Sequence, residues 1–175
     1  DVYAIRKAVD MGLLFFVSNS FSKNLSLYGE RVGGLSVVCK DEAQAKAVQG
    51  QLQFNIRRIY SSPPSHGGHV VDIVMNDEAL FNEWVQEVYV MRDRIKEMRQ
   101  KLRDSLEAKL PGRSFEYITK QNGMFSYTGL TPEQVARIIK DFGIYMVANG
   151  RISVAGLNAS NIDYVANAMA EVLKD

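Results

Sequence analysis

The sequence predicts an α/β fold, because strand-like apolar runs alternate with segments that have the period of a helix. Residues 13–17 and 33–38 form short apolar runs with the length of buried strands. Asp41 then precedes a segment whose apolar residues recur every three or four positions, as they do on one face of a helix. Alternation of this kind is typical of helices packed against a sheet.

The composition excludes several classes of protein. With 175 residues, 46% of them hydrophobic and 23% charged, the chain is typical of globular rather than disordered proteins. A formal net charge of +1 provides no broad basic surface, so we expect no nucleic-acid partner. The apolar run 13–17 is too short to cross a bilayer, so we expect no membrane partner. The single cysteine, Cys39, offers no disulfide framework and fits a cytoplasmic location.

Two further helices are expected in the first half of the chain. One covers residues 2–10 and leads directly into the first strand. The helix capped by Asp41 should end near the two prolines at 63–64, since proline cannot continue the hydrogen-bond ladder.

A long amphipathic helix is expected between Asn76 and the Pro-Gly pair at 111–112. We interpret its methionines and its tryptophan as packing residues rather than as part of a cofactor site. A helix of this length should join two domains, residues 1–90 and 91–175. Its apolar stripe consists of Leu80, Trp84, Val88, Met91, Ile95, Met98, Leu102, Leu106 and Leu110.

The last third of the chain predicts a small domain of helices and strands. Thr131 is followed by proline and then by Gln134 at the third helical position, which is the signature of a capped helix start. A final helix should follow, with Ile162, Val165, Met169 and Val172 on its inward face. The expected strands are 115–118, 124–127, 144–148 and 152–154, with a turn at 121–123.

The strongest chemical signal lies around Lys23. A phosphorylated aldehyde such as pyridoxal phosphate requires a lysine amine, which binds it as a Schiff base and moves a proton, and fixed donors for its phosphate. Ser20 and Ser22 offer hydroxyl groups, and Arg31 offers a guanidinium suited to bidentate phosphate binding. Spacing alone leaves a second interpretation open, a solvated surface loop with an ordinary ion pair and turn.

A metal site is not expected. His66 and His69 are three positions apart, but no second pair of cysteine, histidine or carboxylate residues stands at metal-like spacing nearby.

Four separated segments resemble one known family, in its order and at its spacing. The chain is similar to the fold-type I pyridoxal-phosphate enzymes of the aspartate and aromatic amino-acid (tyrosine) aminotransferase family. The resemblance extends over essentially the whole chain and is carried by residues 18–37, 57–64, 120–130 and 149–157.

The resemblance implies a role for each candidate residue near the cofactor. Lys23 would be the Schiff-base lysine, and Ser20 and Arg31 would bind the cofactor phosphate, with Ser22 as a further donor. Tyr28 and Tyr60 are further candidates for lining the site.

The resemblance also implies three substrate-binding residues. Arg151 would bind the substrate α-carboxylate, Arg57 would reach from the neighbouring subunit to a distal carboxylate, and Phe125 would line the pocket. The residues alone leave an alternative open for each. Arg151 could form a structural salt bridge, Arg57 could lie on a solvated helix end, and Phe125 could be a core aromatic.

The implied activity is transamination between aromatic or dicarboxylic L-amino acids and 2-oxo acids such as 2-oxoglutarate, in a cytoplasmic homodimer. The family's aspartate for the pyridine nitrogen has no counterpart before Lys23. We therefore expect an inactive C-terminal fragment, consisting of the end of the large domain (1–90) and the small α+β domain (91–175). Another fold-type I enzyme, such as a lyase or decarboxylase, and a non-catalytic truncated subunit or interaction module are the alternatives.

Overall fold

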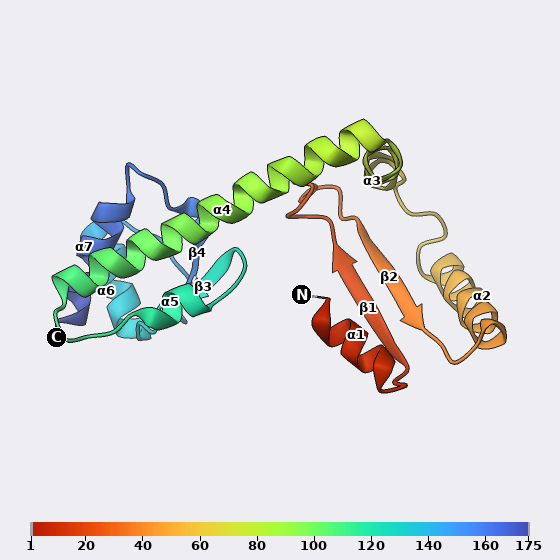
Figure 1. The fold of residues 1–175 in the computed structure, drawn as a ribbon, viewed down its shortest axis with the longest axis horizontal. Coiled ribbons are helices and arrows are strands. Elements are labelled where there is room, and N and C mark those ends of the chain that lie inside the picture. Colours follow the sequence, from red (N-terminus) through yellow and green to blue (C-terminus); the bar gives the residue numbers. More distant parts are fainter. Residues whose placement is uncertain (1, 175) are drawn as a thin grey trace. The chain divides into compact units, whose positions relative to one another are not determined.

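The computed structural model describes residues 2–174 and is drawn in Figure 1. The chain divides into two compact units, Asp1–Gln86 and Glu87–Asp175. Each unit combines helices with a two-stranded sheet, as the predicted mixture of helices and strands requires. No helix among residues 2–174 is both long enough and apolar enough to cross a membrane.

The first unit contains an antiparallel hairpin, in which Phe15 lies opposite Val38 and Ser20 lies opposite Gly33. A side chain at Gly33 would place its Cβ 2.4 Å from the carbonyl oxygen of Asn19, so only glycine allows this close pairing. The elements of this unit are α1 (Tyr3–Asp10), β1 (Phe15–Ser20), β2 (Gly33–Val38), α2 (Glu42–Ile59), α3 (His66–Asn76) and the start of α4 (Glu78–Lys109).

The predictions for the first unit are mostly confirmed. The N-cap of α2 is Asp41, whose carboxylate accepts a 2.8 Å hydrogen bond from the backbone N–H of Gln44. The strand predicted at 13–17 instead starts at Phe15 and continues to Ser20, because its polar end pairs with β2. Helix α3 was not predicted from the sequence.

Helix α4 is continuous over 32 residues, as predicted. The expected burial of its apolar stripe holds only toward its C-terminal end, where Met98, Leu102 and Leu106 are buried. Leu80 and Met91, nearer its start, remain 39% exposed.

The hydrophobic core lies in the second unit, since the buried apolar side chains of residues 2–174 fall between Met98 and Leu173. The N-terminus of α6 has the predicted capping box between Thr131 and Gln134. The elements are the rest of α4, α5 (Glu116–Lys120), β3 (Phe125–Tyr127), α6 (Pro132–Phe142), β4 (Arg151–Ser153), the 3-10 turn η1 (Val154–Gly156) and α7 (Ile162–Leu173).

Two strand predictions in this unit are wrong. Residues 116–120 form a helix, because Phe115 and Ile118 are buried three positions apart, which is the helical period. Residues 144–148 have no regular structure, although their burial alternates as in a strand: Tyr145 is exposed between half-buried neighbours. Among the described residues no strand pairs with this segment.

Candidate active site

Of the predicted cofactor residues, Ser20 ends β1, and the others lie on the connection between β1 and β2. This loop is closed by backbone hydrogen bonds, from the N–H of Phe21 to the carbonyl of Val32 and from the N–H of Leu27 to the carbonyl of Phe21. Ser26 and Arg31 adopt positive φ angles of 54° and 52°, which are uncommon for residues other than glycine. The loop therefore has a definite, locally strained conformation.

The two serines form a local hydrogen-bonded turn. The hydroxyl of Ser20 donates to Ser22 Oγ at 3.0 Å and accepts from the backbone N–H of Ser22 at 3.2 Å. Ser22 is only 4% exposed, whereas Ser20 is exposed. Ser20 is thus the more accessible of the two serines, and Ser22 orients its hydroxyl.

Tyr28 brings Lys23 and Arg31 together. The Lys23 ammonium lies 5.1 Å from the centroid of the Tyr28 ring, and Arg31 Nη1 donates to the Tyr28 carbonyl oxygen at 2.9 Å. Within residues 2–174, neither cation is ion-paired with a carboxylate. Two unneutralised cations and an exposed hydroxyl on one loop are the donor set that a phosphate requires. The residues present therefore fit a phosphorylated aldehyde.

A tryptophan anchors this loop from α4. Trp84 Nε1 donates a 2.8 Å hydrogen bond to the carbonyl oxygen of Asn24, the residue after Lys23. The Asn24 Oδ1 atom is buried without a hydrogen-bond partner in the described chain. The sequence predicts only a packing role for Trp84, because no sequence pattern joins residues 60 positions apart.

Arg57 lies in the last turn of α2 and is exposed. No hydrogen bond or ion pair within residues 2–174 holds its side chain, and no described contact joins it to Lys23. Its neighbour Arg58 instead stacks on Phe54, 5.3 Å from the ring centroid. The structure thus leaves Arg57 available to an anion.

The predicted substrate residues Phe125 and Arg151 meet in the second unit. In the pairing of β3 with β4, Arg151 lies opposite Tyr127 and Ser153 lies opposite Phe125. The Arg151 guanidinium carbon is 5.0 Å from the centroid of the Phe125 ring, a cation–π distance. Phe125 is 41% exposed and is therefore not the simple core residue of the alternative interpretation.

The turn before Arg151 depends on glycine. Gly150 has a φ angle of 80°, and a Cβ there would lie 2.9 Å from the Leu130 carbonyl oxygen. Thr128 Oγ1 donates to the Gly150 carbonyl at 2.8 Å. The hydroxyl of Tyr117 donates in turn to the Thr128 carbonyl, and burial raises the pKa of Tyr117 above its ordinary value. These contacts fix the start of β4.

A cavity of about 630 Å³ opens beside Arg151. Arg151 is the one charged side chain among the described residues that line it. Most of the others are aromatic or aliphatic, such as Phe125 and Tyr164, and Ser153 and Asn161 add polar groups. A single guanidinium in a largely apolar cavity suits a carboxylate that carries an aromatic or aliphatic group. Ser20, Ser22, Lys23, Arg31 and Arg57 belong to the first unit, whereas Phe125 and Arg151 belong to the second.

No three histidine, cysteine, aspartate or glutamate side chains in the described part of the chain are grouped as a metal site would require. His66 lies at the start of α3 and His69 within its first turn.

Comparison with known proteins gives one family. Residues 1–169 match the family described as aminotransferase class I and II. The chain is 54% identical over 173 residues to the aromatic-amino-acid aminotransferase of Escherichia coli strain K12, a match that covers 99% of this chain and 44% of that enzyme.

Solved structures of aminotransferases are also similar to this chain. An aromatic amino-acid aminotransferase from Psychrobacter sp. B6, cocrystallised with aspartic acid, is 73% identical with a TM-score of 0.96, covering 99% of this chain and 44% of that one. An aromatic-amino-acid aminotransferase from Burkholderia pseudomallei, covalently bound to pyridoxal phosphate, is 50% identical with a TM-score of 0.93, covering 98% and 43%.

These matches confirm the fold and the family that the sequence predicted. The chain spans about 44% of the length of two curated relatives, the aromatic-amino-acid aminotransferase of E. coli and a tyrosine aminotransferase of Klebsiella pneumoniae. The chain belongs to the aminotransferase class I and II family.

Proposed function

We propose that this chain provides the lysine-bearing part of a pyridoxal-phosphate-dependent aminotransferase. Its substrates would be aromatic or dicarboxylic L-amino acids and 2-oxo acids such as 2-oxoglutarate. The observation that carries this proposal is the Lys23 loop, which joins an amine, an exposed hydroxyl and a guanidinium without a neutralising carboxylate in the described chain.

Lys23 would hold the cofactor and act as the base. When bound, the cofactor withdraws electrons from the substrate Cα and so weakens its C–H bond. Lys23 is exposed, so its amine could bind the aldehyde covalently and, when free, move a proton at the substrate Cα. Ser20 and Arg31 would bind the phosphate, and Ser22 would orient Ser20.

Arg151 would bind the substrate α-carboxylate. Guanidinium holds a carboxylate by two parallel hydrogen bonds and therefore in one orientation. Phe125 supports this geometry by packing against the guanidinium. Arg57, from a neighbouring subunit of a homodimer, would receive the second carboxylate of a dicarboxylic substrate.

The two units would correspond to two domains of the whole enzyme. Residues 1–90 would be the C-terminal portion of the large cofactor domain, and residues 91–175 the small domain, joined by α4. The chain alone would be inactive, since the family's partner for the pyridine nitrogen lies outside it. We place the enzyme in the cytoplasm, where a free thiol such as Cys39 stays reduced.

Two other functions remain as alternatives. A fold-type I lyase or decarboxylase would use the same lysine, but a decarboxylase must release the carboxylate that Arg151 would hold. A non-catalytic interaction module is favoured by the exposed apolar side chains of the first unit, such as Phe16 at 64% and Leu35 at 52% exposure.

A chimaera tests the proposed function. The part of the E. coli aromatic-amino-acid aminotransferase that aligns with this chain is replaced by residues 1–175, and transamination of phenylalanine, tyrosine and aspartate by 2-oxoglutarate is measured. We expect activity that is lost in the Lys23→Arg chimaera. A folded chimaera that binds pyridoxal phosphate but transfers no amino group contradicts the proposal.

A further inference from the structure

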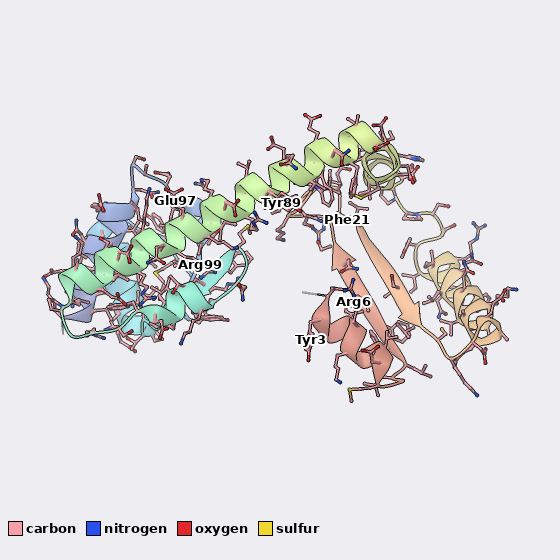
Figure 2. All side chains as sticks on the ribbon, viewed as in Figure 1. Tyr3, Arg6, Phe21, Tyr89, Glu97 and Arg99 are labelled. Carbon is pink, nitrogen blue, oxygen red and sulfur yellow. The ribbon has the colours of Figure 1, made fainter. Side chains whose placement is uncertain are left out.

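Arg99 is a buried cation that the proposed reaction does not use. It lies on α4 in the second unit, is labelled in Figure 2, and is only 3% exposed. Its two terminal nitrogens donate four hydrogen bonds, one for each of their N–H groups. The acceptors are the carbonyl oxygens of Ile118 (2.8 Å), Gly123 (2.9 Å) and Phe125 (2.7 Å) and the hydroxyl of Ser126 (3.0 Å).

No carboxylate compensates this charge within residues 2–174, and the Arg99 Nε atom is buried without a partner. Burial lowers the pKa of the Arg99 guanidinium below its ordinary value, although guanidinium remains charged in proteins. A buried charge without a carboxylate partner is costly to desolvate, and hydrogen bonds to neutral acceptors offset that cost only in part. Packing alone therefore does not account for an arginine at this position.

The acceptors of Arg99 all belong to one segment, the end of α5 and the start of β3. Without Arg99, three backbone carbonyls and one hydroxyl would have to find other donors inside the unit. The guanidinium therefore ties α4 to Ile118, to the turn at Gly123 and to the first residues of β3.

A glutamine extends the same network along β3. Ser126 Oγ, which accepts from Arg99, donates to Gln121 Oε1 at 2.9 Å. The Gln121 amide also accepts from the N–H of Tyr127 at 2.8 Å and donates to its carbonyl at 3.0 Å. The backbone of β3 is thereby held on the side away from β4.

The segment fixed in this way carries the ring that packs on Arg151. Phe125 provides both a carbonyl acceptor for Arg99 and the aromatic face for the Arg151 guanidinium. A displacement of β3 would move this ring and the pairing between Tyr127 and Arg151 together.

We propose that Arg99 is a positioning residue, which fixes β3 so that Phe125 and Arg151 present one orientation of the guanidinium to a carboxylate ligand. This inference rests on the proposed function in so far as Arg151 is taken to bind carboxylate.

The test compares variants of the 175-residue chain by NMR of the Arg151 side chain. The Nε–Hε signal of Arg151 is assigned by its loss in Arg151→Lys, and its ring-current shift is defined by the difference from Phe125→Leu. Arg99→Met and Arg99→Lys remove the two terminal guanidinium nitrogens that donate to α5, the turn and β3. Arg103→Lys, one turn further along α4, is the matched control because Arg103 is half-buried and paired with Glu107.

We expect Arg99→Met and Arg99→Lys to lose the ring-current shift of Arg151 and Arg103→Lys to keep it. Phenylacetate, titrated as an aromatic carboxylate, should bind about tenfold more weakly to both Arg99 variants than to the unmodified chain. The position of Arg151 is the readout, because a general loss of stability would leave the shift intact in the folded fraction. If both Arg99 variants unfold, Ser126→Ala and Gln121→Met interrupt the network with less loss of stability, and they should reduce the shift.

The outcomes distinguish the positioning role of Arg99 from the carboxylate-binding role of Arg151. Arg99 or network variants that retain both the shift and the phenylacetate affinity overturn the positioning role. If the shift depends on Arg99 but phenylacetate does not perturb Arg151 even in the unmodified chain, the positioning role stands and the proposed carboxylate role of Arg151 fails.

Discussion

The indole N–H of Trp84 donates a 2.8 Å hydrogen bond to the carbonyl oxygen of Asn24, immediately after Lys23. This single tryptophan of the chain thereby joins α4 to the loop that carries the proposed cofactor lysine. Its ring also contacts Phe81, with the two centroids 5.6 Å apart.

Trp84→Phe should loosen the Lys23 loop. Loss of one hydrogen bond should lower the free energy of local opening by about 1 kcal/mol. Hydrogen exchange of the amides at 24–28 should accelerate accordingly. Phe81→Leu is the control, because it removes the ring contact and retains the indole N–H. Equal exchange rates in Trp84→Phe and the unmodified chain would show that the bond does not hold the loop.

Gly150→Ala should destabilise the second unit. The substitution forces a left-handed φ of 80° on alanine and places its Cβ 2.9 Å from the Leu130 carbonyl, so we expect a loss of about 1–3 kcal/mol. Gly156→Ala is the matched control, because open space surrounds that position. Denaturant unfolding measures the free energy of unfolding of both variants. A Gly150→Ala midpoint equal to that of the control would contradict the described geometry.

The stability of the chain should depend on the core of the second unit. Leu106 is fully buried, so Leu106→Ala should reduce the free energy of unfolding by about 2–5 kcal/mol. Leu35, which is 52% exposed on β2, gives the control Leu35→Ala, and we expect a smaller loss. Thermal and denaturant unfolding, followed by circular dichroism, measure the loss of stability in Leu106→Ala and in Leu35→Ala. Similar losses would mean that Leu35 is covered in solution.

Glu107 should contribute to stability above acid pH. The backbone N–H of Phe115, and then Arg103, stabilise its carboxylate and lower its pKa below the ordinary value. A lowered pKa in the folded state gives stability that is present above the unfolded pKa of 4.5 and is lost as pH falls through the folded value.

Glu107→Gln should therefore weaken the acid dependence of unfolding between neutral and acid pH. Glu83→Gln, an exposed substitution on α4, serves as its control. An unchanged pH profile for Glu107→Gln would contradict the contribution of this carboxylate.

Local signals in the sequence predicted much of the fold. The hydroxyl, proline and glutamine at the start of α6 act within one helical turn, so their capping role follows from the sequence alone. The same is true of Asp41 at the start of α2. In contrast, α3 contains two adjacent glycines and has no capping hydrogen bond, so no local signal marks its start.

Contacts between distant residues account for what the sequence could not predict. A Cβ at Gly67 would lie 3.0 Å from the Glu30 side chain and 3.1 Å from the Val32 side chain, and this crowding depends on how α3 meets the Lys23 loop. The roles of Trp84 and Arg99 likewise depend on acceptors elsewhere in the chain. Lys23, Arg31 and Arg151 are candidate site residues because the chain resembles a known family, and spacing alone does not separate them from surface residues.

Reductive trapping of the cofactor tests the central claim most directly. The chimaera that carries residues 1–175 is incubated with pyridoxal phosphate, reduced with borohydride and mapped by peptide mass spectrometry. Covalent attachment to Lys23, its loss in Lys23→Arg and its retention in the control Lys40→Arg are the predicted results. Attachment to another lysine, or no attachment to a folded chimaera, would contradict the proposed role of Lys23.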